Sequence, residues 1–289
     1  SGFVPNSTAL IASQVPKNQS GYALGTLSTG TVAGTLMGPL LGGLIAEQFG
    51  MRNVFLLVGF FLFLVSVLTW WGIEEDYQQI SKEEHLSSWE LLASIQHKDI
   101  LLGLFLTSMT IQMIGQSISP ILPLYVRELG QSDNVIFVSG LIVSAMGISS
   151  ILTSGWMGKL GDKIGNHRLL LLSLLYSGIL YIFCALAQTP FQLGLLRFLF
   201  GIGTGALMPG VTALLNRMTP KEGISRIFSY NQLFFYVGGV LGPLMGSSIA
   251  MHVNYHWVFY GTAILAFIDL AFLLFIFRKY LKVREISAH

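Results

Sequence analysis

Charged residues and cysteine are both scarce in this sequence. Only 10% of the 289 residues are Asp, Glu, Lys or Arg, whereas 53% are hydrophobic. Soluble domains carry roughly a quarter charged residues, so this composition argues against an ordinary soluble domain. The single cysteine, Cys184, lies in an apolar run. It excludes an intramolecular disulfide and a site with several thiolate ligands, and we predict that it is a buried packing residue.

Three missing motifs narrow the functional class further. The chain has no glycine-rich loop that ends in Gly-Lys-Ser/Thr, which argues against nucleotide hydrolysis as its energy source. No acids or histidines cluster at one membrane depth, which disfavours a membrane-embedded enzyme, and no cofactor is predicted. His252 and His256 are four residues apart, but the sequence suggests no acidic third ligand near them. We therefore predict interfacial histidines rather than a metal site.

Charges divide the chain into uncharged runs that are long enough to cross a membrane. A helix rises about 1.5 Å per residue, so about 20 residues cross the hydrocarbon layer. Spans are predicted at residues 22–46, 53–73, 100–126, 135–157, 169–187, 190–216, 227–250 and 257–277. Residues 1–15 lack the features of a signal peptide and are interpreted as the end of a cut helix. The pattern predicts an all-α, multi-pass protein of the cell membrane.

Glycines recur at fixed spacing in the first of these spans. Gly30, Gly34, Gly38 and Gly42 lie every fourth residue and form a groove on one helix face, where a second helix can approach closely. Pro39 removes one backbone hydrogen bond, which favours a bend at that depth. The spacing by itself is also what a plain packing stripe would show.

The full glycine pattern is more specific than its spacing. It consists of Gly25, Gly34, Gly38-Pro39 and Gly42-Gly43. This pattern resembles the antiporter motif in helix 5 of the drug:proton antiporters of the major facilitator superfamily, which include bacterial transporters that export quinolones and dyes. The resemblance implies a rigid, bent helix that seals one half of the transporter against the other and favours exchange over uniport.

An internal repeat agrees with this resemblance. A shift of 204 residues places Thr8-Ala9-Leu10 on Thr212-Ala213-Leu214, Gly38-Pro39-Leu40 on Gly242-Pro243-Leu244 and Gly42 on Gly246. Such a repeat arises when an axis along the membrane normal relates two six-helix bundles, as in the major facilitator fold. Residues 1–73 are then the end of the N-terminal bundle, with the tail of helix 4 and helices 5 and 6. Residues 74–98 are a cytoplasmic linker, and residues 99–289 are the C-terminal bundle with helices 7–12 and a tail. The chain is accordingly interpreted as N-terminally truncated.

The distribution of positive charge assigns the two sides of the membrane. Thirteen Lys and Arg residues lie on the side of the linker, the 158–168 loop, the 217–226 loop and the C-terminus. Only Arg52 and Arg127 lie on the other side. By the positive-inside rule, the side rich in Lys and Arg is cytoplasmic.

Residues 158–168 are predicted to form a cytoplasmic loop between helices 8 and 9. Its pattern depends on Gly158, Asp162, Gly165 and Arg168. The glycines permit tight backbone paths, and Asp162 can meet the partial positive charge of a helix N-terminus. The pattern resembles the signature loop of the superfamily, which implies a gating latch between the rocking bundles. A solvated turn with compensating charges is the alternative.

Two charged residues within predicted spans are candidates for proton coupling. Arg197 opens the sequence Arg-Phe-Leu-Phe-Gly-Ile-Gly, which resembles a helix 4 pattern that the family uses in coupling. A structural Arg that snorkels toward the outer surface is the alternative. Asp269 is the one acid deep in any predicted span, so it is a candidate proton carrier or a paired structural residue. The resemblance also implies that the main proton-binding acid often lies in the first half, upstream of this sequence.

The fold implied by the resemblance places helices 7 and 11 at a central cavity. Candidate substrate contacts are Met109, Gln112, Met113 and Gln116 on helix 7 and Tyr230, Asn231, Phe234 and Phe235 on helix 11. Adaptable Met and aromatic surfaces with a few amides suit bulky apolar or cationic compounds better than sugars. Plain packing is the alternative for each of these side chains.

The sequence is most similar to a secondary active multidrug exporter that exchanges drugs for protons by alternating access. It is interpreted as a transporter and not an enzyme, with drug-like molecules, protons and the lipid bilayer as partners and no nucleic acid. A monomer is expected from the resemblance. A proton-coupled metabolite or sugar exporter on the same fold is the alternative within transport. A non-transporting remnant is the third interpretation.

Overall fold

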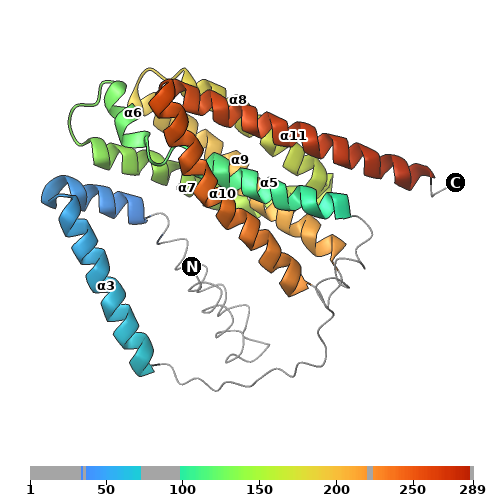
Figure 1. Ribbon diagram of the computed structural model, residues 1–289, viewed down its shortest axis with the longest axis horizontal. Helices are drawn as coiled ribbons and strands as arrows, with labels where there is room; N and C mark the ends of the chain where they lie inside the picture. Colours follow the sequence, from blue (N-terminus) through green and yellow to red (C-terminus); the bar gives the residue numbers. More distant parts are fainter. Residues whose placement is uncertain (1–33, 35–36, 73–97, 220–223, 287–289) are drawn as a thin grey trace.

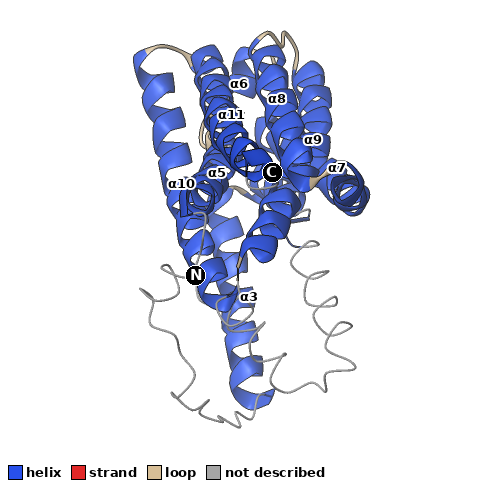
Figure 2. Ribbon diagram, turned by 90° about the vertical axis from the view of Figure 1, so that its right-hand side faces the viewer, coloured by secondary structure: helices blue, strands red, loops and turns tan. Residues whose placement is uncertain are grey.

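Helices account for nearly all of the part of the chain that the computed structural model describes, namely residues 34, 37–72, 98–219 and 224–286 (Figures 1 and 2). Residues 37–49 are helical. The labelled helices are α3 (Met51–Gly72), α5 (Lys98–Gln116), α6 (Leu122–Glu128), α7 (Val135–Ile164), α8 (Asn166–Ala185), α9 (Pro190–Met218), α10 (Ile224–His252) and α11 (Tyr255–Ile286). These ranges contain no strand, which confirms the predicted all-α class.

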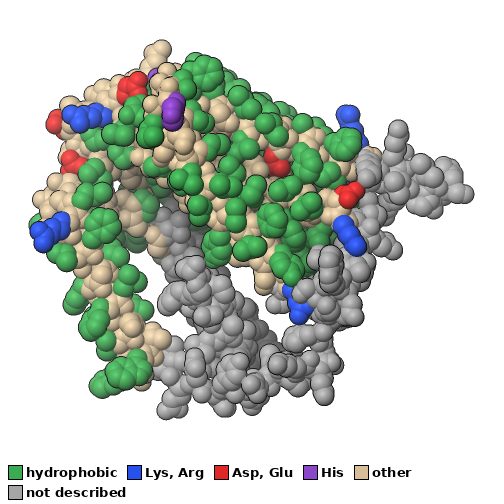
Figure 3. Space-filling view, in the orientation of Figure 1, with side chains coloured by type: hydrophobic (Ala, Val, Ile, Leu, Met, Phe, Trp, Pro, Cys, Tyr) green, Lys and Arg blue, Asp and Glu red, His purple; other side chains and the backbone are tan. Residues whose placement is uncertain are grey.

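Seven helices in the described ranges are long and apolar enough to cross a membrane. They are α3, α5, α7, α8, α9, α10 and α11, and they match the predicted spans from residue 53 onward. Apolar side chains cover the flank of the molecule, whereas charged side chains lie mainly toward its ends (Figure 3). The stub at 1–15, most of the span at 22–46 and nearly all of the linker lie outside the described residues.

The predicted single span at 100–126 is in fact two helices, α5 and most of α6. The chain leaves the helix after Gln116 and makes a turn before α6 begins at Leu122. Pro120 has no N–H to donate to the carbonyl of Gln116, and the N–H of Ser119 bonds that carbonyl instead, at 3.2 Å. The uncharged run continues through this break, so hydropathy alone did not show it.

The predicted loop at 158–168 is also mostly helical. Helix α7 continues to Ile164 and α8 begins at Asn166, so a single residue separates them. Gly165 makes the turn with a φ of 94°, a conformation that glycine adopts without steric strain. Gly158 lies within α7, where it makes no turn.

Helices α5 and α7–α11 pack into one bundle. Helix α7 packs along α9, α10 packs along α5, and α8 packs against both α9 and α11. One buried cluster near α6 contains Tyr125, Tyr181 and Phe259, and a second cluster contains Leu104 and Leu207. Cys184 belongs to the first cluster with 1% of its surface exposed, which confirms its predicted burial. Helix α3 lies apart from this bundle (Figure 1).

Glycines allow the closest helix pairs to touch backbone to backbone. Along α10, a Cβ at Gly238 or Gly242 would collide with the backbone of Met109 or Met113 of α5, respectively. A Cβ at Gly246 would collide with the backbone of Ser117, the first residue after α5. Because lipid tails are as apolar as the helices, such close contact and polar bonds supply the association. Gly201 and Gly205 of α9 meet the backbone of α7 in the same way, at Met146 and Ser150.

We expect Gly242→Ala to destabilise the bundle by about 1–3 kcal/mol, because backbone atoms of α5 cannot move as a flexible side chain would. The new Cβ would lie 2.8 Å from the carbonyl oxygen of Met113. Gly239→Ala is the matched control, since its Cβ would lie 3.5 Å from the side-chain nitrogen of Gln112, an ordinary contact. Thermal unfolding in detergent should show a lower midpoint for Gly242→Ala only. Equal midpoints for the two variants would contradict the packing argument.

Candidate functional site

Part of the glycine pattern of the first span is described. A Cβ at Gly34, Gly38 or Gly42 would meet no described atom within 4 Å. By contrast, a Cβ at Gly43 would lie 3.0 Å from the carbonyl oxygen of Ile136 in α7. Gly25 lies outside the described residues, and the sealing role of the pattern stays a prediction.

Pro39 makes a second contact between this helix and α7. A Cβ at Gly140 of α7 would collide with the carbonyl oxygen of Pro39. The helix at 37–49 therefore touches the first turns of α7 through backbone atoms. This contact joins the segment before the linker to the bundle after it.

The residues of the predicted loop at 158–168 do not all come together. Asp162, near the end of α7, forms an ion pair with Arg217 of α9 at 3.7 Å, and both side chains are largely exposed. Its observed partner is thus a guanidinium rather than the expected helix N-terminus. Arg168 is exposed in the first turn of α8. The gating role of these residues stays a prediction.

Arg197 does not snorkel to the surface, because only 3% of it is exposed. Its Nη1 donates to the hydroxyl of Tyr181 at 3.1 Å, and its guanidinium lies 5.5 Å from the ring centre of Phe200. The Nε atom has no hydrogen-bond partner among the described residues. No carboxylate there forms an ion pair with Arg197 either.

Asp269 is buried where α11 meets α5, with 5% of its surface exposed. Thr107 of α5 donates to its Oδ1 at 3.1 Å, and its Oδ2 has no hydrogen-bond partner in the described part of the chain. No ion pair in that part involves this carboxyl group. The side chain is therefore a buried acid with one hydroxyl donor and one open oxygen.

The candidate cavity residues of helices 7 and 11 lie largely at the contact between α5 and α10. The side chain of Asn231 is 4% exposed and accepts a bond from Ser108 at 2.6 Å. Phe234 stacks on Phe105 with ring centres 5.4 Å apart. Backbone atoms of Met109 and Met113 meet the α10 glycines described above.

The rest of this set is only partly buried, so its side chains are accessible from outside the helix contact. It comprises Gln112, Gln116, Tyr230 and Phe235. A substrate contact for any residue of the set stays a prediction.

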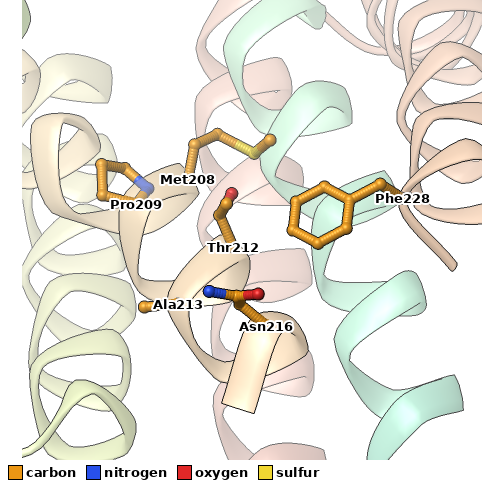
Figure 4. Close-up of a pocket in the computed structure, with 6 residues that line it drawn as sticks. All are labelled: Met208, Pro209, Thr212, Ala213, Asn216 and Phe228. Carbon is orange, nitrogen blue, oxygen red and sulfur yellow. The ribbon is translucent and has the colours of Figure 1, made fainter. Parts of the chain in front are cut away.

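A pocket of about 670 Å³ lies on α9 and α10, in the half expected to face the cytoplasm, and the sequence did not single it out. Its lining consists of Met208, Pro209, Thr212, Ala213, Asn216 and Phe228. Thr212 and the ring of Phe228 face each other across it (Figure 4). Met208, Thr212 and Asn216 recur every fourth residue on α9, and this spacing is the signal that could have located the pocket.

One of the two histidines at the expected outer turn, His256, is closer to an acid than the sequence suggested. Nε2 of His256 lies 3.9 Å from a carboxylate oxygen of Glu128, while its Nδ1 lies 2.7 Å from the carbonyl oxygen of Ala185. His252 contacts the carbonyl of Ser248 in its own helix. Among the described residues, no group of three potential ligands could hold a metal ion.

Comparison with known families decides the assignment of the chain. The profile of the Major Facilitator Superfamily matches residues 1–139 and residues 100–288. The chain belongs to the Major Facilitator Superfamily. As a member of this family it is a transporter rather than an enzyme, and it is a multi-pass protein of the cell membrane.

Two relatives of this major facilitator protein carry functional names. It is 61% identical over 285 residues to a protein of Streptococcus pneumoniae named multi-drug resistance efflux pump PmrA, covering 99% of this chain and 71% of that protein. It is 51% identical to a Lactococcus lactis protein named as a homolog of that pump, with the same coverage.

The fold of this major facilitator chain also matches a solved structure. A bacterial homolog of the human lysosomal transporter Spinster, in an inward-facing and unoccupied conformation, aligns with a TM-score of 0.78. The alignment has 17% sequence identity and covers 96% of this chain and 75% of the other. At that identity the likeness supports the fold alone.

We expect Asp162→Arg to reduce transport several-fold, because it places two cations together where Asp162 and Arg217 now form a pair. Because the pair is exposed, its loss should change the free energy of unfolding by less than about 1 kcal/mol. Adding Arg217→Asp restores opposite charges and should recover transport. Efflux of a fluorescent drug from cells with equal amounts of each variant measures this effect. Failure of the double variant to recover would contradict a functional role for the pair.

Proposed function

We propose that this chain is a secondary active exporter of bulky apolar or cationic drugs, driven by proton entry and working by alternating access. The observation that carries the proposal is the pocket on α9 and α10, whose lining includes no charged residue. The multidrug efflux names of the relatives from Streptococcus pneumoniae and Lactococcus lactis support it. Multi-helix transporters of this kind place their substrates near the interface of two rocking bundles.

The chemistry of the pocket favours drugs over sugars. Met208, Pro209 and Ala213 supply apolar wall, and Phe228 supplies an aromatic face that can receive a delocalised cation. Thr212 and Asn216 add one hydroxyl and one amide. A sugar has a hydroxyl on nearly every carbon and needs many more polar partners, so the metabolite or sugar alternative fits this lining poorly.

We expect Thr212→Trp to abolish most drug export, because the indole would occupy a large part of the pocket. Leu195→Trp is the matched control, since Leu195 lies on the same helix and is 53% exposed outside the pocket. The measurement is efflux of a cationic fluorescent dye from cells with equal amounts of each variant, with and without a protonophore. Export that survives Thr212→Trp would rule out the pocket as the substrate site. Export that ignores the protonophore would rule out proton coupling.

Asp269 is the described residue best suited to exchange a proton within the bundle. Its open Oδ2 can hold a proton, while Thr107 keeps the other oxygen in place. An ionised carboxylate without a cation partner is costly inside a membrane, so a change in water access at this point would change its proton occupancy. Because α11 and α5 meet here, such a change would act on their contact.

We expect Asp269→Asn to uncouple export from the proton gradient, since an amide keeps the shape and the acceptor for Thr107 but cannot release a proton. The measurement is drug-induced proton release in membrane vesicles, followed with a pH-sensitive dye. Thr107→Val is the control, because it removes the hydrogen bond and retains the carboxyl. Full coupling in Asp269→Asn would show that the proton is carried elsewhere.

The remaining architecture belongs to the same proposal. Residues 1–73 and 99–289 are assigned to two bundles that rock about the substrate site, and residues 74–98 to a cytoplasmic linker between them. The contacts of Pro39 and Gly43 with α7 support a direct meeting of the two segments. The functional unit is proposed to be a monomer, with the cytoplasmic pair Asp162 and Arg217 near the inner end of the bundle.

A further inference from the structure

The break between α5 and α6 is held from a single turn of α8. On the α5 side, the hydroxyl of Tyr181 donates to the carbonyl oxygen of Ile114 at 2.6 Å. On the α6 side, the hydroxyl of Tyr125 donates to the carbonyl oxygen of Cys184 at 3.3 Å. Tyr181 and Cys184 are three residues apart and so lie on one face of α8. The outer turn of α8 therefore bonds both arms of the interrupted helix.

Tyr181 is itself held by residues of α9. Its oxygen accepts from Arg197 while its proton goes to Ile114, so a single hydroxyl is used in both directions. The ring packs edge-on against Phe200 with centres 4.7 Å apart. Phe200 also lies under the guanidinium of Arg197. All three side chains are at least 97% buried, so their orientations are strongly constrained.

The end of α5 can take the place of the missing acidic partner of Arg197. The last carbonyl groups of a helix carry a partial negative charge, and a nearby cation is favourable there. Arg197 has no ion-pair partner among the described carboxylates, and Tyr181 links it to one of these carbonyls.

Helices α10 and α11 also contact the chain at the end of α5. The hydroxyl of Ser117 lies 3.0 Å from that of Thr262 of α11, and Gly246 of α10 contacts the carbonyl of Ser117. Helices α8, α10 and α11 thus contact the end of α5 directly, and α9 acts on it through Tyr181.

We propose that Tyr181 and Arg197 are positioning residues for an outer gate. They fix the end of α5, and with it the angle at which α6 continues, so that α6 stays packed over the expected outer end of the bundle (Figure 1). This role explains a buried Arg without any proton transfer by its side chain. Only the role of α6 as a gate rests on the proposed function. The position of α6 can be measured without any transport assay.

The test follows the access of reagent to Val126 of α6, which has no exposed surface. The protein is given the substitutions Cys184→Ala and Val126→Cys and is treated in intact cells with a membrane-impermeant maleimide. We expect Tyr181→Phe to raise the labelling rate about tenfold, because one buried hydrogen bond to each of Ile114 and Arg197 is lost. Tyr176→Phe is the matched control, since its hydroxyl bonds the carbonyl of Leu199, away from the break, at 3.0 Å.

A second variant keeps the test decisive if Tyr181→Phe does not reach the membrane. Arg197→Gln should raise labelling by a similar factor, and its effect should not add to that of Tyr181→Phe because the two residues act through one chain of bonds. Unchanged labelling in Arg197→Gln or Tyr181→Phe would overturn the inference, as would an equal rise in Tyr176→Phe. Dye export through the pocket on α9 and α10 would be unaffected by that result. Failure of the inference about α6 is therefore distinct from failure of the proposed function.

Discussion

Close backbone contact between helices is the constraint on which this structure depends. Within a membrane, burying a leucine against another helix gains little over leaving it in lipid, so specificity must come from shape and from polar groups. Gly238, Gly242 and Gly246 bring α10 onto the backbone of α5, and Gly201 and Gly205 bring α9 onto α7. The same spacing recurs at Gly34, Gly38 and Gly42. A Cβ at these three positions would meet no described atom within 4 Å, so the close contact is shown for α10 only.

Buried polar groups form a second set of constraints between the same helices. Thr107 and Ser108 are neighbours on α5, yet Thr107 bonds Asp269 of α11 whereas Ser108 bonds Asn231 of α10. At the end of α5, the hydroxyl of Tyr181 donates to the carbonyl of Ile114 and accepts from Arg197. These bonds join α5 to α11, α10 and α8, so a displacement of α5 would act on all three of these helices. These bonds offer a physical basis for coupling the proposed proton site, outer gate and substrate pocket.

The general fold was predictable from the sequence because hydrocarbon thickness sets the length of an uncharged run. The break after Gln116 could not be predicted from the pattern of charges, because Pro120 and Pro123 interrupt the helix without adding charge. The segment at 158–168 was mistaken for a loop because glycine and charge usually mark one, although a single left-handed residue, Gly165, makes the whole turn. The site was less predictable still. Spacing assigns residues to a helix but not to a neighbour, so the contact of Asn231 with Ser108 and the pocket beside Phe228 required three dimensions.

The measurement that most directly tests proton-driven drug export uses the purified full-length protein in proteoliposomes without any nucleotide. An imposed pH gradient, acidic inside, should drive accumulation of a cationic fluorescent dye by protein molecules oriented with their cytoplasmic side outward. An ionophore that collapses the gradient should abolish the accumulation, and sugars should not compete. Dye movement that is indifferent to the gradient, or gradient-driven accumulation of a sugar in place of the dye, would contradict the account.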